Sequence, residues 1–291
     1  MNDELLMEIA DCGSPETILK VIYQFHSDWK PPIQIEEFAR SVGIVEFNEL
    51  TVEGFVGALI TNESKSKGSI LSKSGDRGQR QRFTQAHELG HFLIPSHVGN
   101  QQCTAADLRE HRNDTKHQRQ EAEANRFAAG FLMPKSIFGR EMERLGEPEI
   151  DHIINLAQKY NTSVEATANR FTELTEHACA FVFSKNGLVR YSRKSDNFPW
   201  LDVKKDDPLP IGCSTLRSLN APLRKATSWS ETDARVWCSA DTVKRRQIIM
   251  EQSIPQKDSF QTTLLFAEVD LETNEDEEDD TDELWEPPRF R

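Results

Sequence analysis

Residues 82–94 read RFTQAHELGHFLI, and this stretch decides how the rest of the chain is interpreted. Its apolar residues recur at helical spacing, which predicts an α-helix. On a helix, His87 and His91 lie only about 40° apart around the axis, so both imidazoles can reach one metal ion. Glu88 then lies beside that ion, where its carboxylate can take a proton from a water molecule that the ion activates. The HExxH spacing therefore predicts metal-assisted peptide hydrolysis, with His87 and His91 as zinc ligands and Glu88 as general base.

A third ligand is expected on a second helix, within residues 121–134, which read EAEANRFAAGFLMP. Glu121 and Asn125 share one helix face, so Glu121 can bind zinc while Asn125 orients a ligand from behind. Glu123 points about 200° away from Glu121 and is expected to be a solvated surface residue. Three histidines between the two motifs are expected to be loop residues rather than ligands: His97, His111 and His117.

The two motifs, RFTQAHELGHFLIPSH and EAEANRFAAGFLMP, resemble those of the ImmA/IrrE family of zinc metallo-endopeptidases, which are gluzincin-like enzymes. The resemblance covers residues 30–175 and implies Zn²⁺ bound by His87, His91 and Glu121, with Glu88 as general base. Family members typically cleave a helix-turn-helix repressor, which implies an XRE-like repressor as the protein substrate. Cleavage would relieve repression in response to DNA damage, a phage or a mobile element.

Cys103 departs from the family motif and lies in the stretch that joins the two ligand helices. The five cysteines are scattered without a CxxC pair, so they are expected to be reduced thiols rather than disulfides. A thiolate is a strong zinc ligand, so Cys103 could fill the fourth position and hold the enzyme inactive. The alternative is an inert loop cysteine.

The order of elements predicts an α+β fold: a mainly helical, zincin-like peptidase domain with a small antiparallel sheet, then a smaller α+β domain. The segment ACAFVFSKNGLVRY resembles the opening of the GAF-like sensor domain that longer family members add. The strand at residues 68–74 is expected at the cleft edge, where an extended substrate could add as a β-strand. The predicted boundaries are 1–148 for the peptidase domain, 149–177 for helix-turn-helix-like linker helices, 178–271 for the GAF-like domain and 272–291 for a disordered acidic tail.

Direct DNA binding is the alternative function, in a non-proteolytic regulator with a structural zinc. The segment at residues 156–171, LAQKYNTSVEATANRF, offers Asn169 and Arg170 to a DNA groove, but Glu165 and the nearby Glu173 oppose a phosphate backbone. A structural role for this segment is preferred. A structural zinc site would also normally have four protein ligands and no poised Glu88. A third possibility, a general housekeeping peptidase, leaves the extra domain without a purpose.

The composition of the chain indicates where the protein is located and which ligands it can bind. The chain has 291 residues with a mean hydropathy of −0.62, which predicts a soluble protein with no membrane span. An acidic N-terminus without an apolar signal segment predicts a cytoplasmic location. The net charge is −13, but eleven acidic residues fall between Asp270 and Glu286, so the remaining chain is almost neutral. Because the rest of the chain is almost neutral and carries a basic cluster at residues 244–246, the C-terminal domain could bind an effector, either single-stranded DNA or a small molecule.

Overall fold

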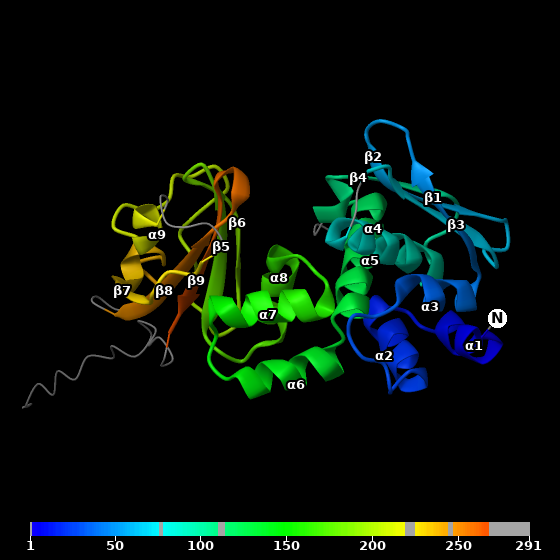
Figure 1. Cartoon of the computed structure of the whole chain (residues 1–291), viewed down its shortest axis with the longest axis horizontal. Coiled ribbons are helices and arrows are strands. Elements are labelled where there is room, and N and C mark those ends of the chain that lie inside the picture. The colour runs from blue at the N-terminus through cyan, green and yellow to red at the C-terminus, as the bar shows by residue number, and fades with distance from the viewer. Residues whose placement is uncertain (1, 76–77, 110–113, 219–224, 244–246, 268–291) are drawn as a thin grey trace, which may run out of the picture. The chain divides into compact units, whose positions relative to one another are not determined.

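The chain divides into two units, Met1–Thr175 and Glu176–Arg291 (Figure 1). The computed structural model describes residues 2–75, 78–109, 114–218, 225–243 and 247–267. The predicted acidic tail, the basic cluster at residues 244–246 and His111 lie outside the described residues.

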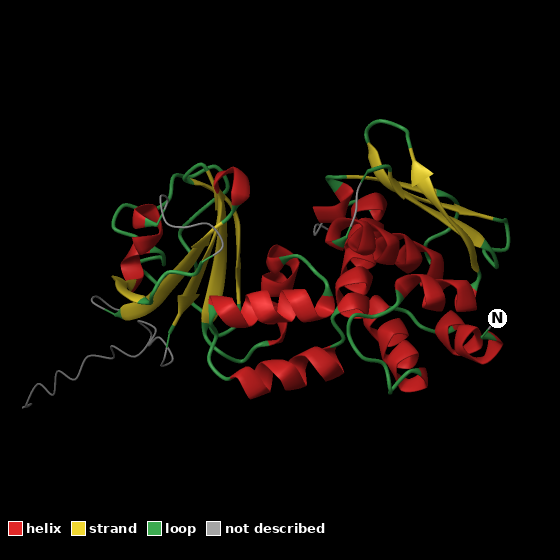
Figure 2. Ribbon diagram, in the orientation of Figure 1, coloured by secondary structure: helices red, strands yellow, loops and turns green. Residues whose placement is uncertain are grey.

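Unit 1 combines helices with a four-stranded sheet (Figure 2). Its helices are α1 (Asp3–Ala10), α2 (Pro15–Phe25), α3 (Ile35–Val42), α4 (Gln79–Leu93), α5 (Lys116–Leu132), α6 (Lys135–Leu145), α7 (Ile150–Tyr160) and α8 (Val164–Leu174), with a short 3-10 turn at Asp107–Arg109. Local sequence fixes several helix starts. For example, the Thr115 side chain accepts a hydrogen bond from the backbone N–H of Gln118, and the Gln118 side chain closes the reciprocal bond. This capping box begins α5 five residues before Glu121.

The sheet of unit 1 is mixed rather than antiparallel as predicted. Its strands are β1 (Ile44–Leu50), β2 (Phe55–Thr61), β3 (Gly68–Lys73) and β4 (Gln101–Thr104), in the order β1-β3-β2-β4. Strands β2 and β3 form an antiparallel hairpin, and β3 then pairs in parallel with β1. The expectation that β3 forms the edge of the cleft was therefore wrong, because β3 is paired on both sides. Strand β4 pairs with β2 and forms one edge of the sheet.

Helix α4 lies between the sheet and α5, and its residues from Thr84 to Leu93 are all buried. A Cβ atom at Gly90 would lie 2.9 Å from the Phe127 ring, so only glycine permits this close approach of α4 to α5. This contact sets the HExxH face of α4 against the face of α5 that carries Glu121.

Unit 2 is built on an antiparallel sheet of five strands in the order β6-β5-β9-β8-β7. The elements are β5 (Cys179–Lys185), β6 (Leu188–Lys194), α9 (Ser214–Arg217), β7 (Ser230–Asp233), β8 (Ile248–Pro255) and β9 (Phe260–Phe266), with 3-10 turns at Ala234–Val236 and Lys257–Ser259. One sheet face packs with Phe198, Trp237 and Val243 into a buried apolar core. The chain thus has the predicted α+β fold, while the GAF-like assignment of this unit stays a prediction.

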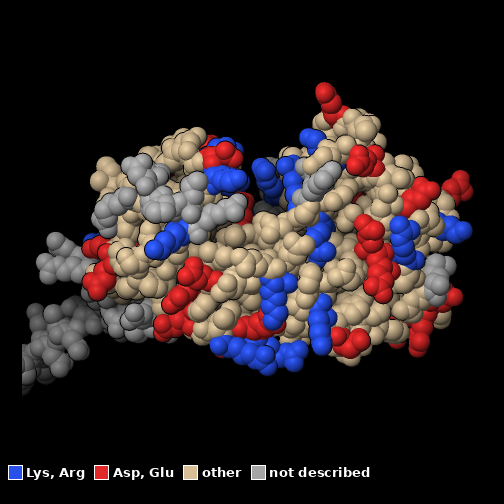
Figure 3. Space-filling model, viewed as in Figure 1, with Lys and Arg blue, Asp and Glu red and all other residues tan. Residues whose placement is uncertain are grey.

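The linker helices predicted at residues 149–177 correspond to α7 and α8, and both belong to unit 1. On the face drawn in Figure 3, acidic and basic side chains are interspersed over each unit. No helix in the described part of the chain is both long and apolar enough to cross a bilayer.

Candidate metal centre

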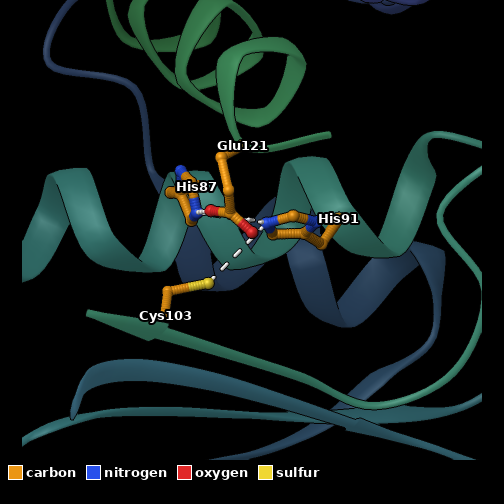
Figure 4. Close-up of side chains that lie close together, drawn as sticks. All are labelled: His87, His91, Cys103 and Glu121. Atoms are coloured by element: carbon orange, nitrogen blue, oxygen red, sulfur yellow. Dashed lines mark hydrogen bonds and ion pairs between the residues drawn. The ribbon is translucent and has the colours of Figure 1, made fainter. Parts of the chain in front are cut away.

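Four buried side chains converge between the sheet of unit 1 and its helices α4 and α5 (Figure 4). Helix α4 supplies His87 and His91, α5 supplies Glu121, and β4 supplies Cys103. Their ligand atoms all lie within 4.8 Å of one another. The Nε2 atoms of His87 and His91 are 3.1 Å apart, Glu121 Oε2 lies 3.2 Å from His87 Nε2, and Cys103 Sγ lies 3.7 Å from His91 Nε2. The structure thus brings together the three predicted ligands and the predicted fourth, and it places Cys103 on a strand rather than in a loop.

These spacings fit one tetrahedral metal ion. Zinc bonds of about 2.0–2.1 Å to nitrogen and about 2.3 Å to sulfur place two nitrogen ligands about 3.3 Å apart and a nitrogen and a sulfur about 3.6 Å apart. The observed separations agree with these values to a few tenths of an ångström. Several lone pairs facing one another in a buried space would be costly without a cation between them. The donor set therefore suits a metal ion.

The electrostatics keep two of these groups in their metal-binding forms. Burial lowers the pKa of His91 to about 4, so its imidazole is neutral. Burial alone would raise the pKa of Glu121, but hydrogen bonds with His87 and His91 outweigh it and hold that pKa well below the usual range. Burial, and then the carboxylates of Glu88 and Glu121, raise the pKa of Cys103, so its sulfur is a thiol until a cation binds.

Asn125 occupies the supporting position that was expected for it. Its Oδ1 lies 2.9 Å from His87 Nδ1, and its Nδ2 donates to the backbone oxygen of Asp107 at 2.8 Å. A proton on Nδ1 of His87 therefore has an acceptor, which leaves Nε2 free to bind a metal.

His97 and Glu123 make contacts that the sequence did not indicate. His97 lies in the loop after α4, as expected, but it is fully buried, with its Nδ1 2.9 Å from His91 Nδ1. Its Nε2 lies 2.9 Å from Glu123 Oε2. The prediction that Glu123 is merely a solvated surface residue was wrong, because it pairs with a histidine from another element. The prediction that His117 is a loop residue was wrong, because it lies in the first turn of α5, with its Nε2 3.2 Å from Asp107 Oδ1 and its Nδ1 3.6 Å from Glu121 Oε1.

Glu88 lies beside the donor cluster and is completely buried. Neither of its carboxylate oxygens makes a hydrogen bond with any residue that the structure describes. Burial raises the pKa of Glu88 to about 7, and the nearby His87 partly opposes that rise.

Gly57 on β2 makes room for this carboxylate, since a Cβ atom there would lie 2.2 Å from Glu88 Oε1. This requirement could not be predicted from the sequence, because β2 and α4 meet only in the folded chain.

The geometry agrees with the comparison to known families. Residues 45–172 match the family model Peptidase_M78, described as the IrrE N-terminal-like domain. Within unit 1, residues 45–172 are therefore similar to an IrrE N-terminal-like domain.

Two of the known proteins that resemble this chain show how far the likeness extends. Over 106 residues it is 31% identical to the radiation response metalloprotease IrrE of Deinococcus radiodurans. That match covers 36% of this chain and spans 31% of the length of the relative. A structure of a Mycobacterium tuberculosis transcriptional regulator has a similar fold, with a TM-score of 0.57 and 13% sequence identity. The alignment covers 91% of this chain and 80% of the regulator's chain. The second likeness concerns the fold alone.

Arg170, near the end of the matched residues 45–172, does not lie where a side chain that reads DNA would lie. It is 8% exposed, and its Nε donates to the backbone oxygen of Met133 at 3.1 Å. Its Nη1 pairs with Glu173 Oε1 at 2.8 Å. The Arg170 guanidinium therefore does not face a DNA groove but links α8 to the end of α5.

Proposed function

We propose that the IrrE N-terminal-like domain is a zinc-dependent endopeptidase. The observation that supports this most strongly is the convergence of His87, His91 and Glu121 beside the buried carboxylate of Glu88, which meets no nitrogen or oxygen donor among the described residues. A structural metal site has no need of such a group, because leaving a buried carboxylate without a partner costs stability.

Each residue of the site has a defined role in this proposal. Zinc bound by His87, His91 and Glu121 would supply Lewis acidity that activates water and polarises the scissile carbonyl group. Glu88 accepts a proton from the attacking water and delivers it to the nitrogen of the leaving amine. Because this nitrogen leaves as a neutral amine, the C–N bond breaks without a high-energy anion. Asn125 holds His87 in the tautomer that the site requires.

The proposed substrate is an XRE-like helix-turn-helix repressor, whose cleavage relieves repression. Strand β4 offers a place for an extended segment of that substrate, because it is an edge strand and carries Cys103 directly into the site. A peptide that adds to this edge gains backbone hydrogen bonds while its scissile bond lies near Glu88. The similarity to a radiation response metalloprotease supports a role in a stress response.

Cys103 is proposed to regulate this activity as an inhibitory fourth ligand. Its sulfur lies at the distance from His91 Nε2 that a shared tetrahedral ion would impose. We expect a Cys103→Ala variant loaded with Co²⁺ to lose the thiolate charge-transfer absorption and to show basal cleavage about tenfold higher. Cys12→Ala is the control, because Cys12 directly follows the C-cap residue of α1 and its Sγ donates to the backbone oxygen of Glu8. Unchanged absorption and activity in Cys103→Ala would leave Cys103 as an inert thiol.

An effector site is proposed in unit 2, for single-stranded DNA or a small molecule. Cationic side chains lie over aromatic rings on β5, β6 and β9. Lys185 Nζ is 4.3 Å from the Phe260 ring centroid, and the Arg190 guanidinium is 5.0 Å from the same centroid. Tyr191 lies beside Arg190 and Arg193. Such pairs suit the stacking of bases and the binding of phosphates.

The experiment follows the intact mass of the helix-turn-helix regulator encoded beside the gene, incubated with the zinc-loaded protein. Glu88→Gln carrying the same amount of zinc is the matched control, and each sample is run with and without single-stranded DNA. Cleavage at one site by the parent protein alone supports the proposal, and a requirement for DNA identifies the effector. An intact regulator under both conditions would favour the alternative, a non-proteolytic regulator with a structural zinc.

A further inference from the structure

We infer that His97 and Glu123 act as a positioning pair that orients His91 and strengthens it as a metal ligand. The inference rests on the proposed function. The three side chains form a line: His91 Nδ1 is 2.9 Å from His97 Nδ1, and His97 Nε2 is 2.9 Å from Glu123 Oε2. His91 and His97 are both completely buried, whereas the Glu123 side chain is 29% exposed.

Only one arrangement of protons satisfies every contact in this line while His91 binds a metal. His91 must present a lone pair at Nε2, so its proton is on Nδ1 and is donated to Nδ1 of His97. His97 then carries its own proton on Nε2 and donates it to the Glu123 carboxylate. The line thus fixes the tautomers of both imidazoles, and it does so without a change in the charge of either ring.

The backbone around His97 is also held in place. Lys65, in the turn between β2 and β3, donates from Nζ to the backbone oxygen of Ile94 at 2.7 Å and to that of His97 at 2.6 Å. These bonds tie the end of α4 and the following loop to the sheet. His97 is therefore presented to His91 from a fixed backbone rather than from a free loop.

The two histidine ligands consequently have different supports. His87 is held by the neutral amide of Asn125, whereas His91 is held by an imidazole that a carboxylate polarises. A carboxylate behind a metal-binding histidine increases the electron density on the coordinating nitrogen, and loss of such a group typically weakens metal binding about ten- to hundredfold. We expect His91 to depend on Glu123 in this way.

The test measures the zinc dissociation constant by competition with a chelator, for the full chain and for Glu123→Ala, Glu123→Gln and His97→Phe. Glu141→Ala is the matched control, because Glu141 is a partly buried carboxylate of α6 that pairs with Lys159 away from the site. We expect the dissociation constant to rise about tenfold or more in Glu123→Ala and His97→Phe. Glu123→Gln should fall between the parent protein and Glu123→Ala, since its amide oxygen still accepts from His97 but carries no charge.

The outcomes separate this inference from the proposed function. A graded loss of zinc affinity, with the control unchanged and the melting temperatures similar, supports the positioning pair. Dissociation constants within twofold of the parent protein in all three variants would overturn the inference, while zinc binding and cleavage by the parent protein would leave the proposed function intact. Failure of the parent protein itself to bind zinc would overturn both.

Discussion

Glu88 in unit 1 and Glu251 in unit 2 are both completely buried carboxylates, but their surroundings are opposite. Glu251 on β8 of unit 2 accepts hydrogen bonds from the backbone N–H and Oγ1 of Thr215, from Oγ1 of Thr232 and from Nε1 of Trp237, at 2.6–3.2 Å. Burial alone would raise its pKa, but these bonds hold the pKa of Glu251 below its usual value. Glu88 in unit 1 has no hydrogen bond from the described residues, and its pKa is raised to about 7.

The difference distinguishes a carboxylate that stabilises a fold from one that is available for chemistry. Every lone pair that Glu251 directs into its core meets a donor, so its charge is balanced by the protein itself. Glu88 lies beside four metal-binding groups and, among the described residues, meets no nitrogen or oxygen donor, which costs stability and is characteristic of functional sites. Exchanging each carboxylate for an amide should therefore have opposite effects on activity and stability.

The largest expected effect is the loss of activity in Glu88→Gln. General bases contribute about 10²- to 10⁴-fold to a rate, so kcat should fall by that factor. The zinc content and the free energy of unfolding should not fall, because an amide is less costly than an unpaired carboxylate in a buried site. Cleavage assays and urea denaturation of the zinc-loaded proteins check this. Full activity in the variant would remove Glu88 from the mechanism.

Gly57→Ala should have the next largest effect, since the new methyl group would push the Glu88 carboxylate away from its place. A displacement of about 1 Å at a catalytic group costs on the order of a hundredfold in rate. The backbone of Gly57 pairs with that of Cys103, and alanine can keep this pairing, so zinc affinity should change far less than activity. The control is Gly139→Ala in α6, where a Cβ atom meets nothing within 4 Å and alanine should stabilise the helix by about 0.5–1 kcal/mol. Equal activity of the two variants would contradict the account of Gly57.

Glu251→Gln should show the reverse pattern, with lower stability and unchanged zinc affinity. An amide cannot accept from all four donors and leaves at least one buried donor unsatisfied, which costs about 1–3 kcal/mol. Urea denaturation followed by tryptophan fluorescence measures this loss. Glu231→Gln on the exposed side of β7 provides the matched control. A variant as stable as the control would show that the hydrogen bonds to Glu251 add nothing.

The smallest expected effect is the pH dependence of the stability difference between the parent protein and Glu251→Gln. The pKa of Glu251 is lower in the folded protein than in the unfolded chain, so its contribution to stability is fully present above the unfolded value of about 4.3. It decreases as the pH falls below that value and vanishes below the folded pKa. The stability gap between the parent protein and Glu251→Gln should therefore narrow at acid pH. A gap that widens toward low pH would contradict the assigned direction.

The parts of this site that could be predicted from the sequence are those that depend on spacing within one helix. His87, His91 and Glu88 follow from the period of α4, and Glu121 and Asn125 from the period of α5. Gly57, the pairing of His97 with Glu123 and the central position of β3 depend on contacts between distant segments. Hydrophobic alternation predicts that a strand exists, but it does not fix the order in which strands pair. The edge strand near the site was therefore assigned wrongly from the sequence and found only in the fold.

The most direct test of the central claim is zinc X-ray absorption spectroscopy on the parent protein and on Cys103→Ala. The account predicts one zinc ion per chain, with nitrogen and oxygen ligands at about 2.0–2.1 Å and one sulfur at about 2.3 Å that disappears in the variant. The nitrogen and oxygen ligands should remain in Cys103→Ala, because His87, His91 and Glu121 are unchanged. A chain that binds no zinc, or a zinc ion surrounded mainly by sulfur, would contradict the account.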